Sequence, residues 1–165
     1  MRDLAYHRVA LAGKRILVVG AGGAVRGILE PLLAEQPSEI VVVNRTAAKA
    51  EQLASDFADL GSIHGGGFET VNGTFDVVIN GTSASLSGDL PPLPDTLFNA
   101  NAWAYDMMYG AEPTVFLQWA GPRARNCWTV WACWSNRPPS RFFCGAMYAL
   151  KPRPCAKCCG NNYSS

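Results

Sequence analysis

The sequence has 165 residues, 48% of them hydrophobic and 16% charged, which is typical of a globular protein with one buried core. No apolar run is long enough to span a membrane, and the opening residues carry Asp3 without the apolar stretch of a signal peptide. Residues 1–120 have a net charge of 7 − 13 = −6, whereas residues 121–165 hold 7 basic residues, no acidic residue and all 6 cysteines. A first segment without cysteine suits a reducing cytoplasm, which we expect as the location.

Four short apolar runs predict strands that are buried on both faces of a parallel sheet, at 15–20, 39–44, 75–80 and within 102–109. Three segments predict helices, over 24–34, over 47–60 with Thr46 as N-cap, and from Pro113 to residue 120. The other predicted features are the end of a helix at 3–12, a loop with one short strand at 61–73 and a Pro-rich surface loop at 81–94. Because strands alternate with helices, we expect a Rossmann-like, doubly wound, mainly parallel sheet with helices on both faces in residues 1–120.

A glycine-rich loop joins the first strand to the first helix, and it consists of Gly20, Ala21, Gly22, Gly23 and Ala24. Gly20 permits a tight turn, and Gly22 lets the backbone approach a pyrophosphate without a side chain in the way. The first N–H groups of the helix and the positive end of its dipole favour an anion there. Val25 stands where the dinucleotide fingerprint has its third small residue, which predicts looser helix packing but an intact phosphate site. The alternative is a turn that only joins strand to helix.

The end of the second strand indicates which dinucleotide is bound. Enzymes specific for NAD place an acidic residue there to hold the ribose 2′-hydroxyl, and such an acid would repel a 2′-phosphate. This sequence has neutral Asn44, followed by Arg45, Thr46, Ala47, Ala48 and Lys49. Arg45 can hold a phosphate with its planar fork of donors, and Lys49 adds a point charge one turn later. We therefore expect NADP rather than NAD; the alternative is a solvated arginine at a helix start, where the dipole disfavours a cation.

These motifs, in this order, resemble the cofactor domain of shikimate dehydrogenase. The resemblance covers about residues 1–120 and is carried by LAGKRILVVGAGGAVRGIL, VVVNRTAAKAEQLA, FDVVINGTSASLSGDLPPLP and YDMMYGAEPTVFLQWA. It implies an NADP-dependent oxidoreductase of aromatic amino acid biosynthesis, which reduces 3-dehydroshikimate to shikimate with NADPH.

The resemblance also implies roles for individual residues. Gly20 to Ala24 would bind the pyrophosphate, and Asn44 to Lys49 would bind the adenosine 2′-phosphate. Asn80 and Thr82 follow a predicted strand and would line the cofactor cleft. Met107 would lie against the nicotinamide, and Tyr109 would hydrogen-bond the substrate; the alternative for Met107 and Tyr109 is plain core packing.

Two parts of the family pattern have no counterpart in this sequence. The family's substrate domain comes before the segment that matches here, and it supplies the catalytic Lys, its Asp partner and the residues that grip the substrate carboxylate. We therefore assign no catalytic residue in this chain and expect it to bind NADP(H) without turning over shikimate. The second part is the closing segment that follows the helix at 113–120, which in the family reads close to DGLGMLVEQAA.

Residues 121–165 replace that closing segment with a sequence rich in Cys and Pro. Cys155 and Cys158 form a single C-x₂-C pair, and no His lies in this segment, so we expect no metal site. Reading the last base of each codon with the first two of the next forces Leu from Cys127–Trp128, Asp from Trp128–Thr129 and Gly from Trp131–Ala132. These letters fall where the family has L-D-x-x-G, so we expect that residues 121–165 are a frameshifted, irregular tail, non-native or disordered, which leaves apolar surface exposed on residues 1–120.

Two alternatives remain beside the damaged shikimate dehydrogenase. One is a standalone NADP-binding module whose Cys-rich tail binds a metal or a nucleic acid. The other is a relative that prefers quinate. As a binding partner we expect only the small-molecule substrate of the full-length family, 3-dehydroshikimate or shikimate. We expect neither a nucleic acid nor a membrane as a partner.

Overall fold

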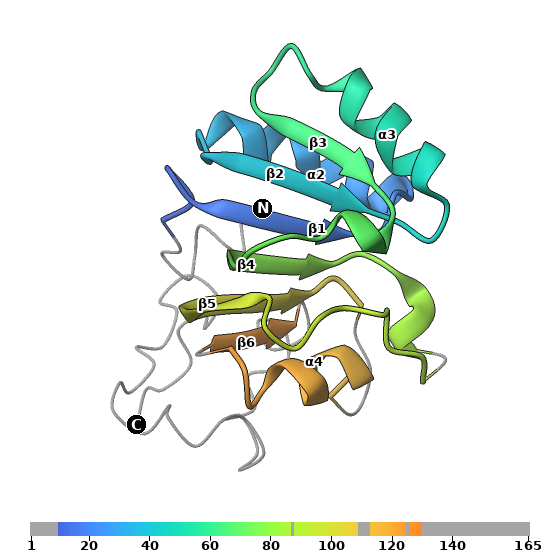
Figure 1. Ribbon diagram of the computed structural model, residues 1–165, viewed down its shortest axis with the longest axis vertical. Coiled ribbons are helices and arrows are strands. Elements are labelled where there is room, and N and C mark those ends of the chain that lie inside the picture. Colours follow the sequence, from blue (N-terminus) through green and yellow to red (C-terminus); the bar gives the residue numbers. More distant parts are fainter. Residues whose placement is uncertain (1–9, 87, 109–112, 125, 130–165) are drawn as a thin grey trace, which may run out of the picture.

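The computed structural model describes residues 10–86, 88–108, 113–124 and 126–129, and a parallel six-stranded sheet lies at its centre (Figure 1). The strands are β1 (Arg15–Val19), β2 (Glu39–Val43), β3 (Ile63–Gly66), β4 (Phe75–Asn80), β5 (Phe98–Asp106) and β6 (Asn126–Thr129). Their order is β3-β2-β1-β4-β5-β6, and every neighbouring pair is parallel. This is the order of a doubly wound Rossmann sheet, so the predicted fold class is confirmed.

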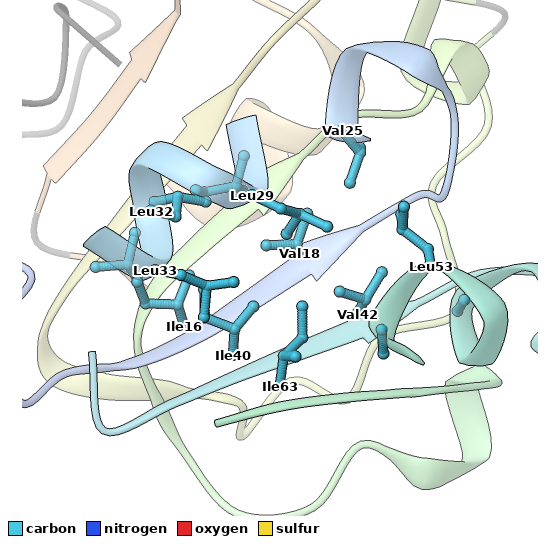
Figure 2. Packing of buried hydrophobic residues seen from close by; sticks show 14 of the residues in the cluster. Ile16, Val18, Val25, Leu29, Leu32, Leu33, Ile40, Val42, Leu53 and Ile63 are labelled. Carbon is cyan, nitrogen blue, oxygen red and sulfur yellow. The ribbon is translucent and has the colours of Figure 1, made fainter. Parts of the chain in front are cut away.

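One face of the sheet is covered by α2 (Gly23–Ala34) and α3 (Ala47–Asp56). Figure 2 shows Val25, Leu29, Leu32 and Leu33 of α2 and Leu53 of α3 packed against Ile16, Val18, Ile40, Val42 and Ile63 of the first three strands. Each such burial contributes about 1.5–3 kcal/mol. Four buried side chains on α2 therefore outweigh Pro31, which costs about 3 kcal/mol inside a helix, and α2 continues through it.

The other face is covered by α4 (Val115–Ala120) and by the segment that leads into β5. Phe116, Leu117 and Ala120 of α4 pack with Leu97 against Val78 of β4. Two short 3₁₀ helices, η1 (Phe68–Thr70) and η2 (Ser83–Leu86), complete the connections on either side of β4. Helices thus lie on both faces of the sheet.

Gly65 marks the closest approach between a helix and the sheet. A methyl group on Gly65 of β3 would overlap the carbonyl group of Ala50 in α3. The absence of a side chain at Gly65 therefore allows α3 to lie directly on β3 at the edge of the sheet.

The structure differs from the sequence predictions at several element ends. The helix predicted over 47–60 ends at Asp56, because the N–H groups of Phe57, Ala58 and Leu60 bond to carbonyls three residues earlier and the chain tightens into turns. Residues 10–12 are not helical, and the rest of the helix predicted at 3–12 lies outside the described residues. Pro113 precedes α4 rather than beginning it, since Thr114 is the N-cap.

The segment 121–129 departs from the prediction in another way. No regular element is expected there, yet β6 extends the sheet and pairs Cys127 with Ala104 of β5. Cys127 is buried, which its small apolar side chain permits. The expected exposed apolar surface is also not found: in the described part of residues 1–120, Leu60 is the only large hydrophobic side chain that is exposed. Residues 130–165, which include the other five cysteines, lie outside the described residues.

Candidate functional site

The carboxyl ends of all strands point to the same edge of the sheet, on the right in Figure 1. The chain leaves β1 toward β2 and returns to the far side of β1 as β4, so the connections diverge between β1 and β4. Ligands of open α/β sheets bind at such a divergence. The glycine-rich loop after β1 and the segment Asn80–Thr82 at the end of β4 meet there, because Gly81 N donates a 2.8 Å hydrogen bond to the carbonyl oxygen of Val19.

Gly20 can only be glycine at this junction. Its φ of +111° is one that other residues rarely adopt, and a Cβ atom would lie 3.0 Å from Cγ2 of Thr82. The tight turn predicted for Gly20 is therefore present, and it packs directly on the segment after β4.

Val25, the departure from the fingerprint, has a partner that explains it. Val25 is fully buried, and a methyl group on Gly81 would overlap its Cγ2 atom. The side chain that is small in the usual fingerprint is thus large here, and the space is supplied by a glycine on the neighbouring loop. Gly81 thus accommodates the larger side chain of Val25, and the looser packing of α2 predicted from Val25 stays a prediction.

A pocket of about 350 Å³ opens between the start of α2 and one side of α3. Its lining residues are Ala21, Gly22, Gly23, Arg26, Ala48, Lys49, Gln52, Leu53 and Asp56. A Cβ atom on Gly22 or Gly23 would meet no atom within 4 Å, so the backbone at the start of α2 is open to a ligand. Five of the sequence-predicted residues line this pocket, namely Ala21, Gly22, Gly23, Ala48 and Lys49.

Sequence reasoning missed four of the lining residues, although a signal for them exists. Gln52, Leu53 and Asp56 follow Lys49 at three, four and seven positions, which is the spacing of one helix face. Arg26 lies one turn after Gly22 on α2. The periodicity that places the core side of α3 could also have indicated which side chains share the face with Lys49.

Two of the missed residues form an ion pair across the pocket. Arg26 Nη1 lies 2.6 Å from Asp56 Oδ2, and Gln52 Nε2 donates a 2.9 Å hydrogen bond to Asp56 Oδ1. The guanidinium carbon of Arg26 also lies 5.5 Å from the centre of the Phe57 ring. The hydrogen bond from Arg26, and then that from Gln52, holds the pKa of Asp56 below its ordinary value, so its carboxylate is charged near neutral pH.

Arg45 and Lys49 differ from the other cations in the described part of the chain. Lys14, Arg15, Arg26 and Arg123 each have a carboxylate within 4 Å, whereas Arg45 and Lys49 form no ion pair and are exposed. They follow β2, where Asn44 Nδ2 donates a 3.1 Å hydrogen bond to the carbonyl oxygen of Thr46 and shapes the turn into α3. Thr46 is the N-cap as predicted, but its side chain makes no cap hydrogen bond.

A buried polar network joins the ends of β4 and β5. Asn80 and Asp106 face each other in register and are both fully buried, and Asn80 Nδ2 donates a 3.1 Å hydrogen bond to Asp106 Oδ1. Thr82 donates to Asn80 Oδ1 from its hydroxyl at 2.8 Å and from its backbone at 3.2 Å. Asp106 further accepts from Met108 N at 2.9 Å and from Thr114 Oγ1 at 2.5 Å. The network thus holds Thr82 in place against the glycine-rich loop.

The remaining predicted residues lie around this network or outside the described part of the chain. Met107 is partly buried, donates its N–H to the carbonyl oxygen of Asn80 at 2.9 Å, and places Sδ beside Gly81. Tyr109 lies outside the described residues, as do all the cysteines after Cys127. Among the described residues, no three His, Cys, Asp or Glu side chains cluster as metal ligands would, and no helix has the length and apolar character needed to cross a membrane.

Comparison with known proteins decides the family. The sequence model of the shikimate / quinate 5-dehydrogenase family matches residues 3–87, just over half of the chain. The chain belongs to this family. Shikimate dehydrogenase (NADP(+)) of Cellvibrio japonicus is 65% identical over 111 residues, 67% of this chain and 40% of the relative. The enzyme of the same name from Chromohalobacter salexigens is 63% identical over 120 residues, 73% of this chain and 44% of the relative.

A solved structure agrees with the family assignment. The crystal structure of an Ael1 enzyme from Pseudomonas putida is 41% identical and matches with a TM-score of 0.69, covering 76% of this chain and 47% of that one. The chain therefore spans less than half of the length of each of these three proteins.

Proposed function

We propose that this chain is the cofactor-binding part of a shikimate dehydrogenase and that it binds NADP(H). The observation that carries the proposal is the pocket at the start of α2, which Lys49 lines and which lies beside the turn into α3 that holds Arg45; among the described residues neither cation forms an ion pair. Both relatives described above are named for NADP(+), which supports the same cofactor here.

The open backbone at Gly22 and Gly23 suits the pyrophosphate. These residues begin α2, whose first N–H groups and positive dipole end attract an anion, and no side chain covers them. An anion of this size therefore gains hydrogen bonds from groups that have no partner inside the helix.

The adenosine 2′-phosphate would lie at Arg45 and Lys49. No acidic residue stands at the end of β2, where Asn44 instead shapes the turn, so a 2′-phosphate meets no carboxylate at this corner. A charged phosphate on the paired donors of Arg45 gives strong, charge-assisted hydrogen bonds. A ribose 2′-hydroxyl would gain much less, which favours NADP over NAD.

In the complete protein, we infer NADPH-dependent reduction of 3-dehydroshikimate to shikimate. Bound NADPH supplies the hydride; within this chain Met107 would lie against the nicotinamide and Tyr109 would hydrogen-bond the substrate. Both relatives are named shikimate dehydrogenase, which favours shikimate over quinate as the substrate. Proton transfer and substrate positioning would come from residues that this chain does not contain, so the 165 residues alone would bind cofactor without turnover.

The test is calorimetric titration of the purified chain with NADPH and with NADH. We expect measurable binding of NADPH and at least about tenfold weaker binding of NADH, since loss of a hydrogen bond to a charged group costs about 1.5–3 kcal/mol. Equal affinity for the two, or no binding of either, would refute the proposal. Reduction of NADP(+) by the chain in the presence of shikimate would separately refute the expected lack of turnover.

A further inference from the structure

One of the side chains that line the pocket, the carboxylate of Asp56, carries a negative charge that repels a phosphate ligand. Among the described residues that line the pocket, Asp56 is the only acid, and it lies on the same face of α3 as Lys49, seven residues further along. Seven residues of helix span about 10 Å, which is close to the Debye length of about 8–10 Å at 0.1–0.15 M salt. An uncompensated carboxylate at Asp56 would therefore be felt by an anion bound beside Lys49.

Arg26 and Asp56 are each placed against the dipole of their own helix. Arg26 lies in the first turn of α2, where the dipole disfavours a cation, and Asp56 is the last residue of α3, where it disfavours an anion. Neither residue stabilises its own helix end through its charge. Their favourable partner is each other, at 2.6 Å across the pocket.

We propose that Arg26 is a specificity-determining residue, which masks the carboxylate of Asp56 so that Lys49 and Arg45 act unopposed on the 2′-phosphate. The inference rests on the proposed function and deepens it. The lining charges are +1 from Arg26, +1 from Lys49 and −1 from Asp56, so the pocket is net cationic only while Arg26 is present. Gln52 holds the second oxygen of Asp56, at 2.9 Å, and so keeps the carboxylate turned toward Arg26.

The experiment measures the affinities of R26Q, D56N and the double variant for NADPH and NADH. We expect R26Q to weaken NADPH binding about two- to fivefold, the range of exposed charge effects, with NADH binding unchanged. D56N is expected to bind NADPH at least as well as the unchanged chain. The double variant is expected to return to the affinity of the unchanged chain. It lacks both the carboxylate of Asp56, which repels the phosphate, and the guanidinium of Arg26, which neutralises that carboxylate. The loss in R26Q should shrink as salt is raised to 0.5 M, as screening requires.

R123Q is the matched control. Arg123 pairs with Asp95 at 2.8 Å and lies 5.1 Å from the centre of the Trp119 ring, so R123Q loses one charge, one ion pair and one ring contact, as R26Q does, together with a 2.7 Å hydrogen bond to the carbonyl oxygen of Trp119. Arg123 follows α4, on the face of the sheet opposite α2 and α3. R123Q should leave the affinity for NADPH unchanged, and thermal unfolding of all variants separates loss of fold from loss of binding.

Two results would overturn the inference. If R26Q and the double variant bind NADPH equally weakly, Arg26 acts directly on the ligand or on the fold and does not mask Asp56. If R26Q binds like R123Q and D56N brings no gain, the pair has no influence on the phosphate. Failure of the unchanged chain to prefer NADPH over NADH is a different result, which refutes the proposed function together with this inference.

Discussion

Thr114 Oγ1 donates a 2.5 Å hydrogen bond to Asp106 Oδ2, and so the residue that caps α4 is tied to the last residue of β5. Both side chains are buried, and the same hydroxyl accepts from Leu117 N at 3.4 Å. Replacing Thr114 by Val keeps the shape but removes a donor to a buried carboxylate, so we expect Thr114→Val to lower the free energy of unfolding by about 1.5–3 kcal/mol. Thr114→Ser, which keeps the hydroxyl, should lose much less.

Urea unfolding of the two Thr114 variants checks this prediction. Thr74→Val is a suitable control, since Thr74 is exposed and its described hydrogen bond uses the backbone carbonyl. A Thr114→Val chain as stable as the Thr74→Val chain would show that the hydroxyl contributes nothing to Asp106.

The contact between Val25 and Gly81 predicts coupling between the two positions. A methyl group on Gly81 would overlap Val25 Cγ2 in a fully packed region, and overpacking of this kind typically costs about 1–3 kcal/mol. Gly81→Ala should therefore be destabilised by about that amount, and Val25→Ala should recover part of it. The measurement is a double-mutant cycle of unfolding free energies, in which additive effects would contradict the contact.

Arg45 is expected to carry most of the preference for the 2′-phosphate. Arg45→Gln removes a charged, forked donor, so binding of NADPH should weaken by about 10- to 100-fold, as for a hydrogen bond to a charged group. Binding of NADH should be unchanged, because it has no 2′-phosphate. Isothermal titration with both nucleotides gives the answer, and an equal loss for NADH would move Arg45 away from the 2′-phosphate.

The lowered pKa of Asp56 predicts a pH dependence. Because hydrogen bonds from Arg26 and Gln52 lower the pKa below 3.8 in the folded chain, the stabilisation they provide is present above that pH and is lost as the pH falls through the folded value. The difference in unfolding free energy between the unchanged chain and Asp56→Asn should be constant between about pH 7 and 5 and decline below about pH 4. Carbon NMR of the Asp56 carboxyl group would report a midpoint below 3.8, and Arg26→Gln should raise it. A midpoint already above 3.8 in the unchanged chain would contradict the pairing.

The coding DNA tests the prediction for residues 121–165. If that segment is frameshifted, the codons from Cys127 to Ser135 must spell L-D-G-L-G-M-L-V when each codon's last base is read with the next two. Wobble positions that forbid this string would show that the segment is encoded as it stands. The strand β6 lies wholly within this segment and pairs with β5 in the sequence as given.

The strands β1, β2 and β4 could be predicted closely because they are buried on both faces, whereas β5 begins at Phe98 with exposed residues before the predicted run at 102–109, and β6 is not predicted. The apolar runs at 15–20 and 39–44 end within one residue of β1 and β2. This agreement is expected, because each hydrophobic side chain in such a run favours burial whichever face of the sheet it lies on. The same holds for the glycine-rich loop, where backbone geometry alone requires Gly20.

Contacts between elements could not be predicted in this way. Arg26 and Asp56 are 30 residues apart, and they meet only because α2 and α3 lie on the same face of the sheet. Asn80 and Asp106 form a pair only because β4 and β5 are in that register. The sequence alone shows each of these four residues as a polar residue near the end of a helix or strand. Which residue becomes its partner depends on the three-dimensional arrangement.

The buried Asn80–Asp106 pair also sets how the edge of the sheet exchanges with solvent. The amide hydrogens of Thr82 and Met108 lie just beyond the strands, yet they bond to the buried Asn80 and Asp106 side chains. Their replacement by deuterium therefore requires the joined ends of β4, β5 and α4 to open together. The Arg26–Asp56 side of the pocket, by contrast, is exposed and can rearrange without any such opening. The two polar groups at this edge of the sheet thus differ in how readily each can open, although both lie at the carboxyl side of the strands.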